Sequence, residues 1–151
     1  MTKVYQGLGL SCMYPENWKL SEDTSTSGSP TGFMIESPTS AFMTVNEYPW
    51  NVAPREAVEK AKEAMEAEYP EAEFEPFEPK LLIKGEPIAD SRAGDIRFYY
   101  LDLLVISRLI AFTVSKKTYL VQIQSEDRDF DKLEQVFQAM LVSMLQSLET
   151  E

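Results

Sequence analysis

Apolar residues recur at steps of three and four in two segments of the chain, which is the spacing of one face of an α-helix. The first segment begins at Pro54, a residue suited to a first helical turn, and ends at Pro70. Its apolar stripe comprises Ala57, Val58, Ala61, Ala64 and Met65. The second segment extends from Asp127 to Glu149, and its stripe comprises Phe130, Leu133, Phe137, Met140, Leu141, Met144 and Leu148. The pattern predicts two amphipathic helices, and aspartates near the start of the second are expected to cap free N–H groups.

The segments before the first helix predict strands. An apolar stretch from Val4 to Met13 is interpreted as one strand that ends in a corner at Tyr14-Pro15-Glu16-Asn17-Trp18. Residues Ser21–Gly32 are polar or turn-forming throughout and predict a loop. Two short apolar runs follow, Phe33–Ser37 and Phe42–Tyr48, and their spacing predicts a hairpin.

The segment between the helices predicts more strands. Residues 71–80 are acidic and contain two prolines, which favours an edge strand over a central one. From Asp95 to Ser125 the chain has the pattern of a β-meander, with a polar turn at Ser115–Thr118. No Gly, Pro or Asn occurs between Ile96 and Ser115, and the first reversal of the meander is predicted within Asp102–Ser107.

Consecutive predicted strands with one helix between them and one after them indicate the α+β class. We expect an antiparallel sheet of about six to eight strands, rich in meander connections, with helices packed against it as a layered sandwich. The length of 151 residues favours one domain spanning 1–151.

The chain is strongly acidic, with a formal net charge of -11. This charge argues against nucleic acid as a partner, because such binding rests on Lys and Arg neutralising phosphates. It also disfavours anionic membrane surfaces, while it permits a basic protein partner. No run approaches the ~18 apolar residues of a membrane span, and no signal-peptide core precedes the first strand. The sequence as given therefore predicts a cytoplasmic protein.

Candidate catalytic chemistry is sparse. The chain has no histidine, which removes Ser-His-Asp and Cys-His arrangements and the commonest metal ligand. The single cysteine, Cys12, lies in an apolar segment and is expected to be a buried structural residue. Asp127, Asp129 and Asp131 imitate the start of a calcium loop, but Lys132 stands where that loop needs Gly. We expect no catalytic residue, no metal and no cofactor.

Several turn and packing motifs together resemble a known superfamily. The corner Tyr14–Lys19 follows a strand, a Ser/Gly-rich segment comes next, and a helix follows Tyr48-Pro49. A segment containing Gly85, a meander ending in Tyr119–Gln122 and a C-terminal amphipathic helix complete the order. In this order, which covers nearly the whole chain, the sequence resembles the Mog1/PsbP-like superfamily, including the DcrB-like bacterial proteins.

The resemblance implies a role in binding or assembly. Members of that superfamily include extrinsic photosystem II subunits, a binder of a Ran-type GTPase and chaperones of type VI secretion effectors, and none is a well-established enzyme. The resemblance leaves the partner open, and no functional residue is transferred from it to this chain.

The apolar run Leu101–Ile110 is the candidate for a partner surface. Either both faces of its strands are covered, by the helices on one side and the N-terminal strands on the other, or part of the run is exposed. In the second case a dimer or partner surface is expected at Leu103, Leu104, Val105 and Ile106. Acidic residues that could flank it, unless they form only a solvated face, are Glu66, Glu68, Glu71 and Glu73.

Three functions follow from these observations. The favoured one is a non-catalytic protein-binding or assembly module of chaperone type, with a protein partner or a second copy of the chain. The alternative is a small-ligand carrier with a pocket between sheet and helix, lined by Met34, Met43, Phe98 and Met140. An enzyme would have to rely on carboxylates, Tyr or Lys, and is disfavoured.

Overall fold

The computed structural model describes residues 1–24 and 30–149, and the structural statements below refer to these residues. Their main element is a seven-stranded antiparallel sheet. Its strands, in spatial order, are β3 (Lys19–Thr24), β4 (Pro30–Glu36), β5 (Phe42–Pro49), β11 (Lys117–Glu126), β10 (Leu103–Val114), β9 (Ser91–Tyr100) and β6 (Glu73–Phe77). Two small hairpins accompany it, formed by β1 (Thr2–Gly7) with β2 (Leu10–Pro15) and by β7 (Leu82–Ile83) with β8 (Glu86–Pro87).

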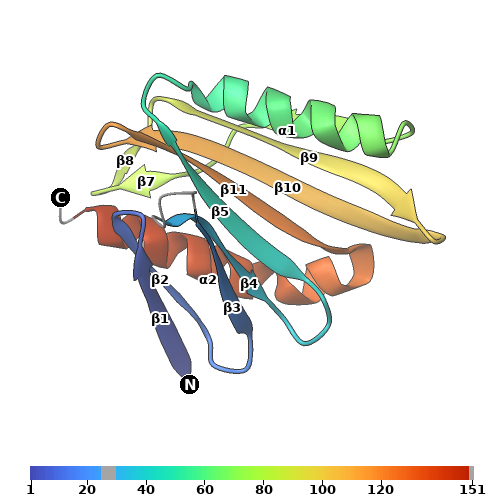
Figure 1. The fold of residues 1–151 in the computed structure, drawn as a ribbon, viewed down its shortest axis with the longest axis horizontal. Coiled ribbons are helices and arrows are strands. Elements are labelled where there is room, and N and C mark those ends of the chain that lie inside the picture. The colour runs from blue at the N-terminus through green and yellow to red at the C-terminus, as the bar shows by residue number, and fades with distance from the viewer. Residues whose placement is uncertain (25–29, 150–151) are drawn as a thin grey trace.

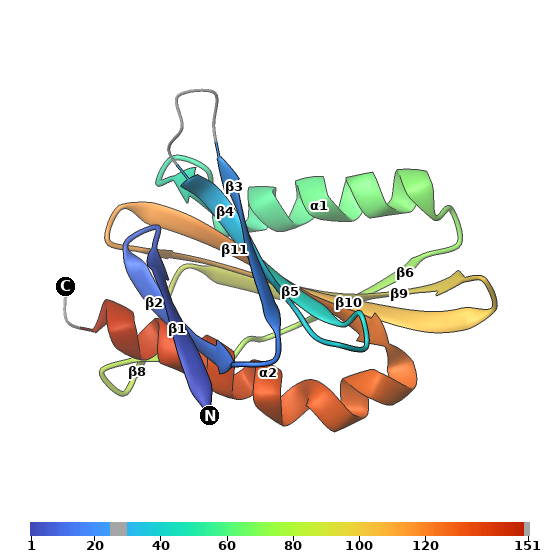
Figure 2. The same ribbon diagram turned by 60° about the horizontal axis from the view of Figure 1, so that its bottom comes forward.

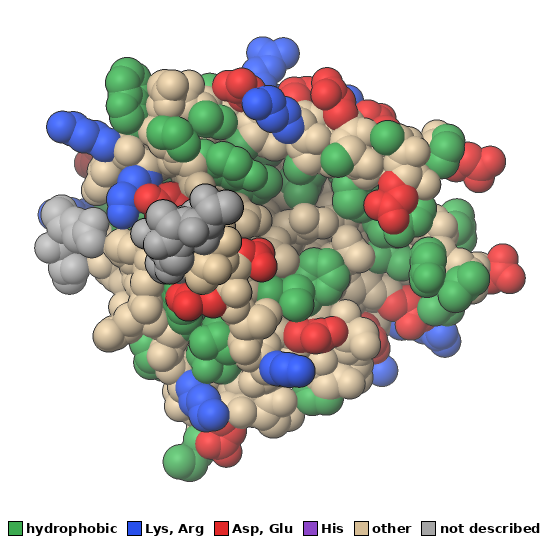
Figure 3. Space-filling view, in the orientation of Figure 1, with side chains coloured by type: hydrophobic (Ala, Val, Ile, Leu, Met, Phe, Trp, Pro, Cys, Tyr) green, Lys and Arg blue, Asp and Glu red, His purple; other side chains and the backbone are tan. Residues whose placement is uncertain are grey.

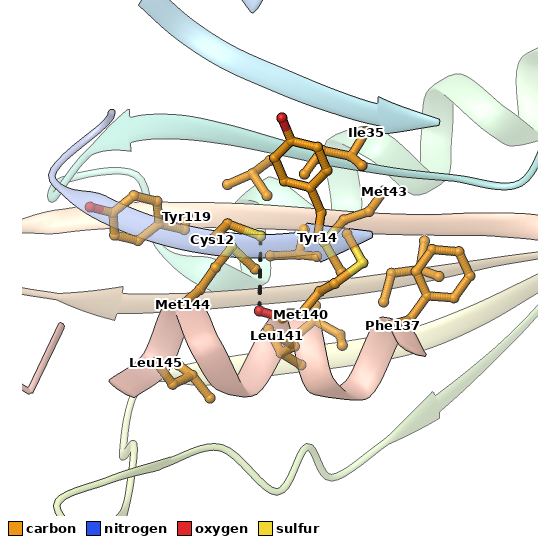
Figure 4. Close-up of a cluster of buried hydrophobic side chains, with 14 of the residues drawn as sticks. Cys12, Tyr14, Ile35, Met43, Tyr119, Phe137, Met140, Leu141, Met144 and Leu145 are labelled. Carbon is orange, nitrogen blue, oxygen red and sulfur yellow. Dashed lines mark hydrogen bonds between the residues drawn. The ribbon is translucent and has the colours of Figure 1, made fainter. Parts of the chain in front are cut away.

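Two helices cover opposite faces of the sheet, so the molecule has three layers (Figures 1 and 2). Helix α1 (Pro54–Glu68) packs on β9, β10 and β11 over a small core that includes Val58, Ile96 and Leu109. Helix α2 (Asp127–Leu148) and the hairpin β1–β2 cover the other face. Side chains from β2, the sheet and α2 converge there in the larger core (Figure 4).

The predicted fold class is confirmed, and so are both helices to within one or two residues. The meander is formed by β9, β10 and β11 with continuous antiparallel register. The acidic segment after α1 supplies β6, which is an edge strand as its prolines predicted. The corner after Tyr14 is also present, since the Trp18 amide donates to the carbonyl of Pro15 at 3.1 Å.

One strand assignment and one loop assignment were wrong. The stretch Val4–Met13 is a hairpin, because Leu8 (φ 56°) and Gly9 (φ 77°) form a two-residue turn between β1 and β2. The Ser21–Gly32 segment is not a loop throughout: its two ends belong to the paired strands β3 and β4. Residues 25–29 of that segment lie outside the described part of the chain. Backbone pairing to a neighbouring strand does not require apolar side chains at an exposed edge, so composition alone misses it.

The first reversal of the meander lies earlier than predicted. Leu101 (φ 51°) and Asp102 (φ 66°) form a two-residue turn, so all of Leu103–Ile106 belongs to β10. The start of α2 also differs from expectation. Its N-cap is Glu126, and no side chain caps it by a hydrogen bond, so the nearby aspartates act at most through their charge.

The hairpin β1–β2 is joined to α2 by hydroxyl groups. Ser143 and Ser147 accept hydrogen bonds from the amides of Met13 (3.0 Å) and Ser11 (2.9 Å), at the outer edge of β2. The two serines lie one helical turn apart on α2, and the two amides lie two residues apart on β2. The rise of one helical turn is close to the rise of two strand residues, so both hydrogen bonds form side by side. From the sheet, the Tyr119 hydroxyl donates to the Leu8 carbonyl at 2.6 Å. The hairpin is therefore an ordered part of the α2 layer.

Candidate functional site

The turn between β9 and β10 carries the densest group of exposed apolar side chains in the described chain. Tyr99 is 69 % exposed, Tyr100 53 %, Leu101 79 % and Leu103 43 %. The hairpin projects past the end of α1, and hydrophobic and acidic side chains gather at that end of the molecule (Figures 1 and 3). Contiguous exposed apolar side chains are uncommon on isolated proteins and mark interaction surfaces.

The backbone of this turn is unfavourable for its residues. Both turn positions have positive φ, which two-residue hairpins satisfy with Asn-Gly or Asp-Gly. Here the first position is Leu101, whose Cβ makes a left-handed conformation cost about 1 kcal/mol. Its side chain is also exposed to water. Neither local conformation nor burial therefore accounts for leucine at this position.

The α1 side of the hairpin tip is aromatic. The ring of Tyr69, just after α1, stacks on Phe98 with centroids 4.1 Å apart and meets Tyr100 edge-on at 6.5 Å. Leu103 pairs with Tyr100 across the two strands and faces the same side. Desolvation raises the pKa of Tyr69, and the neighbouring Glu68 raises it further. The three rings form an aromatic cluster beside the exposed turn.

Two hollows lie beside the tip and are lined by acidic side chains. One, of about 300 Å³, includes Glu68, Glu71 and Tyr99. The other, of about 480 Å³, includes Glu71 and Tyr99 again, with Glu73 and Leu104. Among residues 1–24 and 30–149, no ion pair within 4 Å involves the carboxylates of these three glutamates. An unpaired acidic rim around an apolar tip favours a cationic partner.

The open backbone edge lies at the same place. Strand β6 pairs with β9 from Phe77–Ala93 to Glu73–Arg97 and reaches no further. The last three residues of β9, Phe98–Tyr100, therefore pair only with β10. Arg97, at the boundary, is the basic residue of the 480 Å³ hollow, and its guanidinium lies 3.4 Å from Glu75.

The structure separates the residues predicted as a partner surface. Leu103 is exposed and Leu104 half-buried, on opposite faces of β10. Val105 is half-buried against the α1 core, and Ile106 is 7 % exposed in the larger core, so Ile106 does not belong to any surface. The inner end of this run is covered, by α1 on one face of β10 and by α2 on the other face instead of the expected N-terminal strands. Its outer end is exposed, and a role of that end as a partner surface stays a prediction.

The predicted acidic residues are divided as well. Glu68, Glu71 and Glu73 line the two hollows beside the tip. Glu66 is half-buried on α1 and lines neither of them. Sequence reasoning missed Tyr99, Tyr100 and Leu101 as surface residues, because it placed the reversal later. The sequence did contain a signal for this site: the meander has to reverse within a stretch that contains no Gly, Asn or Pro.

The pocket predicted for a small ligand is not lined as expected. Met43 and Met140 belong to the larger core, whereas Phe98 belongs to the α1 core on the opposite face of the sheet. Met34 is half-buried on β4. These four side chains do not form one lining, because residues of different strand parity face opposite sides of a sheet.

A hollow does lie between the sheet and α2, near the 77–81 segment, with a volume of about 290 Å³. At its mouth, Arg108 donates to both carboxylate oxygens of Asp95 (2.9 and 3.1 Å) and to Glu134 (3.3 Å). Its guanidinium lies 5.2 Å from the ring of Phe77 and 4.9 Å from that of Phe130. Burial alone would lower the pKa of Arg108, but its bonds to both carboxylates raise it. These internal contacts hold the cation in a structural role.

The remaining sequence expectations concern chemistry. Cys12 is fully buried, and its thiol lies 3.9 Å from the carbonyl of Met140 (Figure 4). Burial raises its pKa to about 12. Within the described ranges, no group of three His, Cys, Asp or Glu residues is arranged to hold a metal ion. No helix of the described chain is long and apolar enough to cross a membrane.

Comparison with known proteins identifies the fold of this chain through solved structures of low sequence identity. No protein-family model and no curated protein matches the sequence. Among solved structures, cyanobacterial PsbP (CyanoP) from Synechocystis sp. PCC 6803 is similar with a TM-score of 0.63 and 11% identity, over 94% of this chain and 90% of that one. The Ran-binding protein Mog1p of Saccharomyces cerevisiae is similar with a TM-score of 0.59 and 11% identity, over 98% of both chains.

A protein of unknown function from Pseudomonas aeruginosa is similar with a TM-score of 0.50 and 16% identity, over 93% of this chain and 94% of that one. Identities this low establish architecture and carry no information on partners. The similarity extends over nearly the full length of each chain, with the same α+β layering. The chain therefore has the Mog1/PsbP-like fold.

Proposed function

We propose that this protein is a non-catalytic binding module that docks a protein partner at the tip of the β9–β10 hairpin. The observation that carries the proposal is Leu101, which is 79 % exposed and holds a left-handed backbone conformation. Its left-handed backbone and its exposed apolar side chain are both unfavourable for the folded state. Residues that are unfavourable for the folded state are concentrated at functional sites.

The surroundings of Leu101 support the same function. Tyr99, Tyr100 and Leu103 supply further apolar contact area, and Tyr residues in particular are enriched at binding hot spots. The tip is held by the stacked rings of Tyr69 and Phe98 beneath it, so little conformational entropy would be lost on binding.

The chemistry of the partner follows from the rim. Glu68, Glu71 and Glu73 line the two hollows beside the tip, and the whole chain carries a net charge of -11. A segment with aliphatic or aromatic anchors flanked by Lys and Arg complements this surface, with the charges setting the rate of encounter. Mog1p, which shares this fold at 11% identity, is a Ran-binding protein. It is a precedent for protein binding in general and not for a particular partner. The proposal assigns no catalytic residue and no cofactor.

A selection experiment tests the proposal. A random peptide library displayed on phage is panned on the wild-type protein, and recovered peptides are measured by fluorescence anisotropy. We expect sequences enriched in Lys or Arg around apolar residues. Leu101→Asn should weaken their binding about 30-fold or more, as for a hot-spot residue, and raised salt should weaken it further.

The matched control is Gln138→Glu, a substitution on exposed α2 surface distant from the tip, which should leave peptide binding unchanged. Peptides without basic residues, or peptides that bind Leu101→Asn as tightly as wild type, would contradict the proposal. The single domain 1–151 and the cytoplasmic location stay predictions of the sequence, to be tested by limited proteolysis and by cell fractionation.

A further inference from the structure

The backbone hydrogen bonds of the β9–β10 hairpin follow a phase that one contact at its far end fixes. The Thr113 amide donates to the Asp90 carbonyl at 3.1 Å, and the register continues unbroken from there to Tyr100 opposite Leu103. In an antiparallel pair, every second residue directs both its N–H and its C=O at the partner strand. The even-numbered residues of β9 therefore bond to β10, and the odd-numbered residues direct their backbone groups to the other side.

On that other side, the neighbouring strand ends early. Strand β6 pairs with β9 only as far as Glu73, opposite Arg97. The turn before β6 takes the chain out of line, since the Ala72 amide donates to the Tyr69 carbonyl at 2.9 Å. Tyr99 is the next residue of β9 with outward backbone groups, and in the described chain no backbone hydrogen bond joins it to the segment before β6. Its N–H and C=O are therefore open to a partner.

The open edge, Phe98–Tyr100, is not protected in the usual ways. Exposed strand edges are commonly blunted by proline, by charged side chains or by a bulge. Strand β6 has such protection, with Pro76 and two glutamates. The open edge consists of aromatic residues in regular register with β10, and Tyr99 and Tyr100 are both more than half exposed. An edge of this kind accepts an added strand.

The two hollows beside the tip lie on opposite faces of the open edge. The hollow of about 300 Å³ includes Phe98, which belongs to the α1 core. The hollow of about 480 Å³ includes Arg97 and Leu104, which face the other side of the sheet. Glu71 and Tyr99 line both hollows, so the two meet at the open backbone groups. An added strand directs alternate side chains to the two faces, and each face has a hollow to receive them.

We propose that the partner docks as an extended segment that adds a short strand to the open edge of β9, in line with β6. The segment runs antiparallel to β9, as every other strand pair of this sheet does. One of its residues exchanges both backbone hydrogen bonds with Tyr99. This inference rests on the proposed function, because it states how the partner of the hairpin tip lies against the protein.

The register assigns the middle residue of the segment to the larger hollow. Side chains of opposed residues share a face, so the residue opposite Tyr99 faces the same side as Tyr99 and Leu104. Arg97 in this hollow is already bonded to Glu75. The remaining contact surface is the ring of Tyr99 and the side chain of Leu104, which suits an aliphatic residue.

The two flanking residues of the segment face α1. The residue opposite Phe98 enters the smaller hollow, where Glu68 and Glu71 favour lysine or arginine. The residue opposite Tyr100 meets the aromatic cluster of Tyr69 and Tyr100, which favours an apolar side chain. Because the segment runs antiparallel to β9, its order from N- to C-terminus is apolar, aliphatic, basic.

Two capped peptides of identical composition test this order. Thr-Phe-Leu-Lys-Thr has the expected order, and Thr-Lys-Leu-Phe-Thr has the reverse order and is the matched control. Each is titrated into the wild-type protein, and the amide chemical shifts of the protein give the dissociation constant. We expect the first peptide to bind about 10-fold more tightly or better, since only its lysine meets the glutamates while its phenylalanine meets the aromatic cluster.

Backbone methylation of the first peptide tests the hydrogen bonds themselves. N-methylation of its leucine removes the N–H that donates to the Tyr99 carbonyl and should weaken binding about 10-fold. N-methylation of its lysine is the control, because that N–H points away from β9, and binding should change by less than about 2-fold.

Hydrogen exchange of the Tyr99 amide tests the same contact from the protein side. In the free protein this amide should exchange faster than those of Phe98 and Tyr100, which bond to β10. Saturation with the first peptide should slow its exchange about 10-fold or more, because the amide gains an acceptor.

Three results would overturn strand addition: no binding of either peptide, equal binding of the two, or full binding after N-methylation of the leucine. A Tyr99 amide that is already protected in the free protein would also overturn it, since the edge would then be closed. If library-selected peptides still require Leu101 in any of these cases, docking at the tip stands and only its strand geometry fails. If binding of the selected peptides is unchanged in Leu101→Asn, the docking site itself fails.

Discussion

Arg108 and Asp95 form the most buried ion pair of the described chain, on adjacent strands of the sheet. The two residues are directly opposed in the β9–β10 register, and the guanidinium donates to both carboxylate oxygens. The side chain of Asp95 is 10% exposed and that of Arg108 25%. This pair links the sheet to α2, because Arg108 also bonds to Glu134.

Removing the cation should therefore destabilise the fold. Arg108→Gln leaves the carboxylate of Asp95 buried without its partner, and we expect the free energy of unfolding to fall by about 3 kcal/mol. Urea denaturation measures this loss. Glu134→Gln is the control: its carboxylate is 53% exposed, and the change should cost less than about 1 kcal/mol. Equal losses from the two substitutions would show that Asp95 is not the partner that matters.

Leu101→Asn should raise stability. Asparagine adopts positive φ more readily than leucine and suits the first position of this turn, so we expect a gain of about 0.5–1 kcal/mol. Thermal unfolding measures the gain. Together with the loss of peptide binding proposed above, a rise in stability would separate the functional role of Leu101 from any structural one. A fall in stability would instead place Leu101 among the residues that hold the hairpin.

The serine hydroxyls of α2 should control opening of the β1–β2 hairpin. Ser143→Ala removes the acceptor for the Met13 amide, and we expect a cost of about 1 kcal/mol and faster hydrogen exchange in β2. Ser143→Thr keeps the hydroxyl and serves as the comparison. Unchanged exchange in the alanine variant would mean that the hairpin is held by its apolar contacts alone.

The buried thiol of Cys12 should make the fold sensitive to alkaline pH. Burial raises its pKa from 9.0 to about 12, so the folded state keeps a proton that the unfolded state loses. The stabilising contribution is present in full below pH 9 and is lost as pH rises toward 12, at up to about 1.4 kcal/mol per pH unit.

Urea denaturation between pH 8 and pH 10 tests this dependence. Cys12→Ala should be less stable than wild type at pH 8, because it leaves a small cavity, but should lose stability less steeply above pH 9. The pKa of Tyr5 is also raised, by burial and by Glu22, and this second contribution remains in both proteins. Parallel curves for the two proteins would show that the thiol ionises freely in the folded state.

The sequence alone determined the elements whose pattern repeats with a strong period. The stripe from Phe130 to Leu148 specified α2, and the meander pattern from Asp95 to Ser125 predicted strands where β9, β10 and β11 lie. Prolines correctly assigned β6 to an edge. Burial of Cys12 also followed from its apolar neighbours. These features are local, because helix and strand periods are properties of neighbouring residues.

Only the tertiary structure decided which residues of the Leu101–Ile110 run reach the surface. Turns at Leu8-Gly9 and Leu101-Asp102 depend on positive φ that the flanking strands impose through their twist, and leucine gives no signal of it. Because the chain reverses at Leu101 and not later, Ile106 lies in the core, and Tyr99 and Tyr100 lie at the exposed tip. Likewise, the outward backbone groups of Tyr99 stay open only because β6, from a distant part of the sequence, ends its pairing with β9 at Glu73.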